Sequence, residues 1–241
     1  MSSDKADKAA LEVVARQLAA AVHHGRRKSA ACLTTGGKRI AIELVTPAFR
    51  EGAGPIRLRF DRVAVALVDR VRAALQGLLP RDRTVVITCT APIRLAAKTA
   101  ATLEETTRSL IGSRTAAVQT ALVHGNQVQV AILRGSPAGA GRVVGFVHNP
   151  GCDPAVFLEL IQPLLDSPRR RQVRSMGTAR ERWLVLADER GVVPLDAYRS
   201  VCRQLHLARG FARILLVLPG GRIETLTAGA PRRLSGSARA I

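Results

Sequence analysis

The stretch GGKRIAIELVTPAFREG, residues 36–52, decides the first expectation about the fold. A Gly-Gly turn leads into the apolar run Ile40–Ile42, which carries one acid, Glu43, into a predicted strand. The run AACLTT precedes the same turn, so we predict a β-hairpin with Lys38 and Arg39 at its tip. The carboxylate of Glu43 is then either a metal ligand or a side chain that faces water.

Outward from this hairpin, hydrophobic periodicity predicts further elements on both sides. The pattern indicates helices over residues 5–23, 62–78 and 95–112 and a third strand at 55–60. Asp61 is a suitable N-cap for the second of these helices. The continuous apolar run TVVITCT, residues 84–90, is typical of a buried central strand.

The middle of the chain changes character. Three strand-like runs, 115–123, 127–134 and 142–148, are joined by HGN and GSPAGAG, which favours an antiparallel meander. Asp153 and Pro154 then open a helix to about residue 165. The last elements predicted are a strand, a helix and two further strands, over 183–187, 195–206, 212–219 and the segment RIETLT.

These elements predict a single α/β domain over residues 1–227, with a mixed sheet flanked by helices. The meander is expected as an insertion at about 115–148. Residues 167–182 are expected as a basic connector, because they are rich in Arg and lack periodicity. Residues 228–241 are expected to form a flexible basic tail.

The net charge of +19 points to a polyanionic partner. Arg outnumbers Lys by 32 to 5, a skew that the codons of a GC-rich, bacterial-type genome produce by themselves. Codon usage does not explain why 37 basic residues face only 18 acidic ones. We therefore expect nucleic acid, DNA or RNA, as the partner.

The cysteines and the N-terminus indicate the compartment. Cys32, Cys89, Cys152 and Cys202 lie far apart, three of them in apolar runs, as expected for free thiols in a reducing cytoplasm. The N-terminal segment lacks the apolar core of a signal peptide, and no apolar run approaches the length of a membrane helix. We therefore expect a cytoplasmic protein with no membrane contact.

Three basic segments are candidates for contacts to phosphate. Their residues are Arg26, Arg27 and Lys28; Lys38 and Arg39; and Arg169, Arg170, Arg171 and Arg174. The planar guanidinium group donates two hydrogen bonds to a phosphate, so such clusters give affinity for the backbone without reading base sequence. Each segment taken alone is equally compatible with a solvated basic loop.

The order helix, hairpin, strand, helix, strand over residues 5–90 resembles the restriction-endonuclease-like, or PD-(D/E)XK, superfamily. The phrase GGKRIAIELV is similar to the hairpin strand that carries a catalytic Glu in that family, and the strand–helix–strand at 183–219 is compatible with it. The resemblance covers about half of the chain. It implies a restriction-endonuclease-like core with Glu43 at a metal-holding position.

Active members of the superfamily also need an Asp upstream of the Glu and a Lys just after it, which together hold Mg²⁺ and orient water. In this chain the region of the Asp reads Ala30, Ala31 and Cys32, and the position of the Lys is Val45. Glu12 matches the position of an additional acid in some members. The resemblance therefore implies a degenerate site; an intact Mg²⁺ site and an ordinary solvent-facing or capping Glu remain the alternatives.

A second constellation falls at the ends of the predicted meander strands. An up–down–up meander would place His124 and His148 at one end of the sheet, followed by Cys152 and Asp153, a set that could bind Zn²⁺ or serve acid–base chemistry. The alternative is that HGN and HNPGCD are turns and that Asp153 is a helix cap.

These observations favour a non-catalytic nucleic-acid-binding protein that contacts the phosphate backbone through Arg clusters, alone or within a larger complex, and needs no cofactor. One alternative is a metal-dependent nuclease or hydrolase with an incomplete or relocated site, which would use Mg²⁺ or Zn²⁺. Another is a structural subunit that binds an acidic protein partner.

Overall fold

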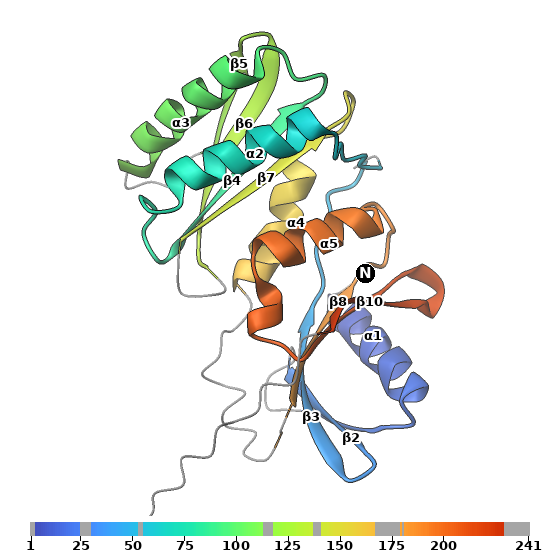
Figure 1. Ribbon diagram of the computed structural model, residues 1–241. Coiled ribbons are helices and arrows are strands. Elements are labelled where there is room, and N and C mark those ends of the chain that lie inside the picture. The colour runs from blue at the N-terminus through green and yellow to red at the C-terminus, as the bar shows by residue number, and fades with distance from the viewer. Residues whose placement is uncertain are drawn as a thin grey trace, which may run out of the picture.

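A long insertion between β3 and β8 divides the strands into two mixed sheets, each flanked by helices (Figure 1). A computed structural model describes residues 3–24, 30–52, 55–112, 118–136, 141–166, 179 and 181–228. Sheet A has the strand order β1-β2-β3-β8-β9-β10, and sheet B has the order β5-β6-β4-β7. The elements are α1 Ser3–Gln17, β1 Ala21–His24, β2 Ala30–Thr35, β3 Lys38–Val45, α2 Arg62–Leu75, β4 Arg83–Thr90, α3 Ala96–Gly112, β5 Val118–Val123, β6 Asn126–Arg134, β7 Arg142–His148, α4 Ala155–Asp166, β8 Glu181–Ala187, α5 Leu195–Gln204, η2 Leu207–Arg209, β9 Arg213–Val217, η3 Pro219–Gly221 and β10 Ile223–Ala228.

The predicted hairpin is confirmed as β2 and β3, which pair antiparallel around Gly36 and Gly37. Both glycines have positive φ, 51° and 72°, which only glycine adopts at little cost. The helix predicted at 5–23 ends earlier, at Gln17, because residues 21–24 form the edge strand β1 against β2. Strand β8 then joins β3 in parallel after the insertion.

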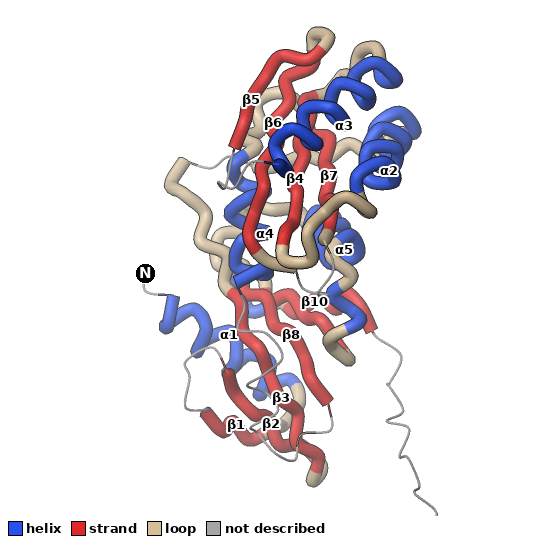
Figure 2. Tube along the Cα trace, turned by 90° about the vertical axis from the view of Figure 1, so that its left-hand side faces the viewer, coloured by secondary structure: helices blue, strands red, loops and turns tan. Residues whose placement is uncertain are grey.

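Sheet A is covered on both faces. Helix α1 packs on one face, where Leu11 and Val14 join the cluster that contains Ile40 and Ile42. Helix α5 lies on the other face (Figures 1 and 2). Because side chains alternate along a strand, Glu43 points to the α5 face and not to α1.

The predicted meander is wrong in its third strand. Strands β5 and β6 form the expected antiparallel hairpin, but β4 lies between β6 and β7, and β7 pairs with β4 in parallel. The run TVVITCT is therefore a buried central strand, as predicted, but of sheet B. The strand predicted at 55–60 is limited to an isolated bridge between Leu58 and His148.

Helices α2 and α3 lie on one face of sheet B and α4 on the other (Figure 2). The predicted cap of α2 is confirmed, since the Asp61 carboxylate accepts a hydrogen bond from the Ala64 amide at 3.0 Å. Asp153 likewise accepts one from the Ala155 amide at 2.9 Å, at the start of α4. None of the described helices is both long and apolar enough to cross a membrane.

One hydrophobic cluster joins the two sheets. It contains Val144 and Phe146 of sheet B, Leu184 and Leu186 of sheet A, and the buried faces of α4 and α5 between them. Leu160 of α4 lies within this cluster and is fully buried. The packing of α4 and α5 therefore sets how the two sheets sit relative to each other.

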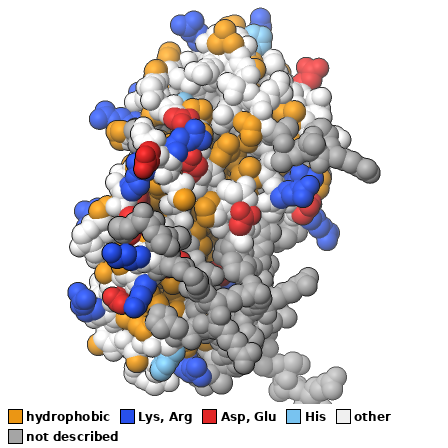
Figure 3. All heavy atoms as spheres, turned by 180° about the vertical axis from the view of Figure 1, so that it is seen from behind, with side chains coloured by type: hydrophobic (Ala, Val, Ile, Leu, Met, Phe, Trp, Pro, Cys, Tyr) orange, Lys and Arg blue, Asp and Glu red, His pale blue; other side chains and the backbone are white. Residues whose placement is uncertain are grey.

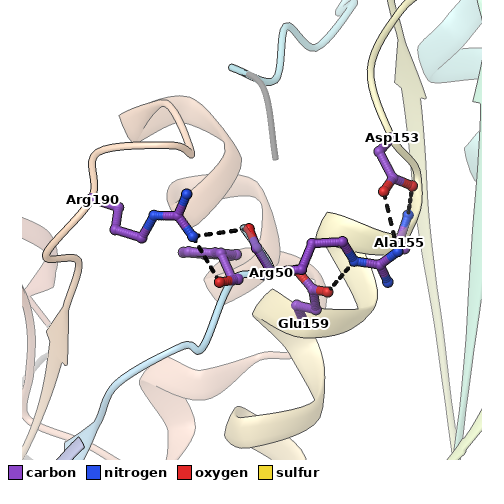
Figure 4. Close-up of polar contacts among 6 residues, drawn as sticks. Arg50, Asp153, Ala155, Glu159 and Arg190 are labelled. Carbon is purple, nitrogen blue, oxygen red and sulfur yellow. Dashed lines mark hydrogen bonds and ion pairs between the residues drawn. The ribbon is translucent and has the colours of Figure 1, made fainter. Parts of the chain in front are cut away.

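Polar contacts fix the chain where it leaves sheet A for the insertion (Figure 4). Arg190, just after β8, donates from Nη1 to the carbonyl oxygens of Phe49 and Arg50 at 2.8 and 2.9 Å. The Arg50 side chain reaches α4, where its Nε donates to Glu159 at 2.6 Å and its Nη1 lies 3.4 Å from Asp153. These contacts tie the crossing segment to both β8 and α4.

Candidate functional site

Glu43 is buried and forms an ion pair with Arg182. Its side chain is 7% exposed, and Oε2 accepts a hydrogen bond from Nη2 of Arg182 at 3.0 Å. The guanidinium group of Arg182 also lies 5.0 Å from the centre of the Phe211 ring. The expectation of a solvent-facing Glu is therefore wrong, because Arg182 on the neighbouring strand β8 provides a counter-charge inside the protein.

The other positions implied by the nuclease resemblance do not converge on Glu43 as ligands. Cys32 and Ala31 pair with Ala41 and Ile42 across the hairpin, and Val45 belongs to the hydrophobic cluster between the sheets. Glu12 is an exposed residue of α1, the helix that covers the opposite face of sheet A. Glu12 and Glu43 are therefore separated by the sheet.

His124 and His148 lie at the same end of sheet B, as predicted, but at its opposite edges. His124 follows β5, and its Nε2 lies 3.1 Å from Oγ1 of Thr102. His148 ends β7, with β6 and β4 in between, which puts the two strands roughly 14 Å apart at the usual spacing of about 4.8 Å. The predicted pairing of the two imidazoles is therefore wrong.

Cys152 and Asp153 have structural contacts. The Cys152 sulfur accepts a hydrogen bond from the Arg57 amide at 3.4 Å, and Asp153 caps α4 and pairs with Arg50. Within the part of the chain that the structure describes, no group of three or more His, Cys, Asp or Glu side chains could hold a metal ion.

The four cysteines are free, as predicted, and three of them are buried. Burial raises the pKa of Cys89 and of Cys202 to about 12. Both thiols therefore stay protonated at neutral pH, which excludes them as thiolate nucleophiles.

His148 predicts a pH dependence of stability. Burial lowers the pKa of His148, and the same is true of His206. In the unfolded chain the histidine pKa is about 6.5, so below that pH the unfolded state binds a proton that the folded state does not. The histidine's contribution to the free energy of unfolding is therefore complete above about pH 6.5 and is lost as the pH falls toward the folded-state pKa. The free energy of unfolding should fall between about pH 7 and 5, by at most about 1.4 kcal/mol per pH unit for each histidine.

Urea denaturation at a series of pH values measures this slope. His148→Gln should flatten it, whereas His23→Gln, a change at an exposed position on β1, should leave it unchanged. Equal slopes for the wild type and His148→Gln would contradict the assignment.

Most of the predicted phosphate-binding residues lie outside the described residues. These are Arg26, Arg27, Lys28, Arg169, Arg170, Arg171 and Arg174. Lys38 and Arg39 are described, and both are exposed at the tip of the β2–β3 hairpin, next to the turn.

A groove between α2 and α5 gathers a different set of basic side chains. It has a volume of about 1140 Å³, and β7 and β10 also contribute to its lining. We call it the arginine groove, after its basic residues Arg59, Arg72, Arg199, Arg203, Arg209 and His206. Both helices face the viewer in Figure 1.

The arginines of the groove differ in how their charge is balanced. Arg59 and Arg199 have exposed partners, Asp61 at 3.3 Å and Asp196 at 3.5 Å. Arg203 and Arg209 form no ion pair with any carboxylate of the described residues. These two exposed guanidinium groups are therefore available to an external anion.

Arg72 has a structural role in the groove wall. Its guanidinium group donates to Val143 O at 3.3 Å, to Asp69 at 2.5 Å and to Gln204 at 2.5 Å. The Gln204 amide in turn exchanges two hydrogen bonds with the backbone of Gly145, at 2.9 and 3.0 Å. This network joins α2, α5 and the edge strand β7, and it provides partners for backbone groups of Val143 and Gly145 at that sheet edge.

Basic side chains also lie on the opposite side of the molecule. Figure 3, seen from behind Figure 1, shows Lys and Arg side chains scattered over that face and mixed with acidic and hydrophobic ones.

The chain matches no protein-family model, and no curated protein or solved structure gives a significant match either.

Sequence reasoning did not find the arginine groove. Its basic residues come from α2, α5, η2, the segment before α2 and the link between α5 and η2, and they form no run of like charge along the chain. The spacing of Arg199 and Arg203, four residues apart on one helix, is the single local signal that places two of them on the same face.

Proposed function

We propose that the protein binds nucleic acid without cleaving it and that the arginine groove contacts the phosphate backbone. The observation that carries this proposal is the placement of Arg203 and Arg209 on one groove without a described carboxylate partner. Guanidinium groups in such a position suit phosphate, because each can donate two parallel hydrogen bonds to it.

The rest of the groove supports the same ligand. Phe60 lines it with half of its side chain exposed, so one aromatic ring is available to stack on a base. Contacts of this kind do not read base sequence, and we therefore expect affinity that depends on salt and little on sequence.

Basic residues outside the groove add to the positive charge that an anionic ligand would meet. Lys38 and Arg39 are exposed at the hairpin tip. The segments that the structure does not describe contain no Asp or Glu at all, although they include Arg26, Arg169 and other predicted phosphate contacts. The excess of basic residues therefore extends beyond the groove.

We further propose that sheet A with α1 and α5 is a restriction-endonuclease-like core with a degenerate site. The order α1, β2–β3, β8, α5, β9 supports the first part of this proposal. The ion pair between Glu43 and Arg182, with Val45 buried in the core, supports the second. The protein would then need no metal cofactor, and its four free cysteines suit the cytoplasm.

The test is binding to DNA and RNA oligonucleotides over a range of salt concentrations. The double variant Arg199→Ala/Arg203→Ala should lower affinity by about tenfold or more, since hydrogen bonds to charged groups contribute about 1.5–3 kcal/mol each. The slope of log affinity against log salt should fall by about 0.9 per lost contact for duplex DNA, or 0.7 for single strands.

Lys98→Ala/Arg108→Ala is the matched control, because it removes the same charge from exposed positions on α3, outside the groove. An equal loss of affinity in this control, or no binding of the wild type at low salt, would refute the proposal that the arginine groove binds nucleic acid. Cleavage that requires Mg²⁺ and is lost in Glu43→Ala would instead support the nuclease alternative. Failure to bind nucleic acid, together with retention of an acidic protein by the groove, would support the structural-subunit alternative.

A further inference from the structure

A more buried basic cluster lies where α5 ends and β7 begins. Arg142, the first residue of β7, is 6% exposed. His206 follows α5 and is half-buried, and Arg209 ends η2; both line the arginine groove. We call these three residues the Arg142 cluster.

The positive charges of the cluster act on one another. Burial and the charge of Arg209 lower the pKa of Arg142. Burial and the charges of Arg142, Arg209 and Arg72 lower the pKa of His206. Arg72 donates to the carbonyl of Val143, the residue after Arg142, and to Gln204, two residues before His206, which brings these parts of the chain together. Arg72 also has a carboxylate partner, Asp69.

Two hydrogen-bonding atoms in the cluster are buried without a partner. They are Nε of Arg142 and Nδ1 of His206. A buried guanidinium nitrogen without a partner is costly, because it has lost water and gained no compensating hydrogen bond. A bound ligand with hydrogen-bonding oxygens would provide partners for both atoms.

No carboxylate that the structure describes supplies the missing charge. Arg142 and Arg209 form no ion pair with a carboxylate of the described residues. The segments outside the described residues contain no Asp or Glu. An anionic ligand can supply this counter-charge.

We propose that the Arg142 cluster is a binding site for one phosphate monoester group. Such a group is close to a dianion at neutral pH and has three terminal oxygens, which suits two guanidinium groups and an imidazole. A backbone diester carries one charge and has chain on both sides, whereas the buried position of Arg142 favours a group that ends there. The site shares Arg209 with the arginine groove but not Arg199 or Arg203, so loss of phosphate binding in Arg142→Met and loss of oligonucleotide binding in Arg199→Ala/Arg203→Ala test the two proposals apart.

Inorganic phosphate is the first probe, measured by calorimetric titration and by thermal unfolding against sodium chloride of equal ionic strength. A ligand that binds the folded state raises the unfolding temperature by mass action. We expect phosphate to do so for the wild type and expect Arg209→Ala to weaken phosphate binding by about tenfold or more. Arg108→Ala, a change at an exposed position on α3, is the matched control.

Arg142→Met separates a ligand-binding role from a structural one. If Arg142 lacks a counter-charge in the free protein, the variant should be at least as stable as the wild type in phosphate-free buffer and should lose the response to phosphate. If Arg142 instead stabilises the fold by itself, Arg142→Met should be less stable than the wild type and should still respond to phosphate.

The source of the phosphate is tested with two phosphorylated compounds. A nucleoside monophosphate is compared with the nucleoside, and a 5′-phosphorylated oligonucleotide is compared with the same oligonucleotide without the phosphate. Tighter binding of either phosphorylated compound, lost in Arg209→Ala, supports the site and assigns it to a free nucleotide or to a strand end. Equal affinity with and without the phosphate, or a phosphate effect that chloride reproduces, overturns the proposal and leaves an adventitious ion only.

Discussion

Leu160→Ala is expected to lower the free energy of unfolding by about 3–5 kcal/mol, the upper range for truncation of a buried leucine. Leu160 is fully buried at the centre of α4, inside the cluster that joins sheet A and sheet B. The surrounding side chains belong to two sheets and two helices, so they cannot all move inward to fill the space. The cavity therefore remains largely open, which is the condition for a high cost.

Urea denaturation gives the change in free energy, and Leu158→Ala is the matched control. Leu158 lies on the same helix and loses the same atoms, but it is only partly buried against the cluster. The control should cost clearly less. Amide exchange should accelerate in both sheets of the Leu160 variant, since the core is shared; a loss confined to one sheet, or equal costs at the two positions, would contradict this account.

The elements of the fold that depend on local pattern were predictable from the sequence. The Gly36–Gly37 turn and the cap at Asp61 were both confirmed, because a positive φ or a capping oxygen is a property of a few consecutive residues. The N-terminal helix was overextended, because AVHH carries no local signal that it pairs with β2.

Strand pairing in sheet B could not be obtained in the same way. Residues 84–90 and 142–148 are two continuous apolar runs, and nothing within either run specifies that they lie side by side in parallel. A meander needs only neighbouring strands to pair, so it was the simplest arrangement of the last three runs. The observed pairing instead brings together segments that are far apart in the chain, and tertiary packing decides it.

The candidate site was missed for a related reason. Glu43 is balanced by Arg182, which lies 139 residues further along the chain, so its burial could not be inferred from its neighbours. The arginine groove likewise combines Arg59 before α2 with Arg203 on α5 and Arg209 after it. Runs of basic residues are visible in a sequence, but single arginines that converge on one groove are not.

Gly145→Ala is expected to lower the free energy of unfolding by about 2–3 kcal/mol, although it adds one methyl group. A Cβ at this position of β7 would lie 2.6 and 2.9 Å from the two Cγ atoms of Val68 on α2. Val68 is β-branched and stiff within its helix, so it cannot turn away, and the helix itself must shift. Gly77→Ala is the control, because a Cβ there meets nothing within 4 Å.

The double variant Gly145→Ala/Val68→Ala should recover part of the loss, because the two Cγ atoms that collide are removed. We expect it to be more stable than Gly145→Ala alone, and two costs that simply add would contradict the clash. The same shift of α2 would pull Arg72 away from Val143 and Gln204, which hold the wall of the arginine groove against α5. Gly145→Ala should therefore also weaken oligonucleotide binding at temperatures where the variant is still folded, and the double variant should restore it. Unchanged binding in folded Gly145→Ala would show that the spacing of α2 and α5 does not set the affinity of the groove.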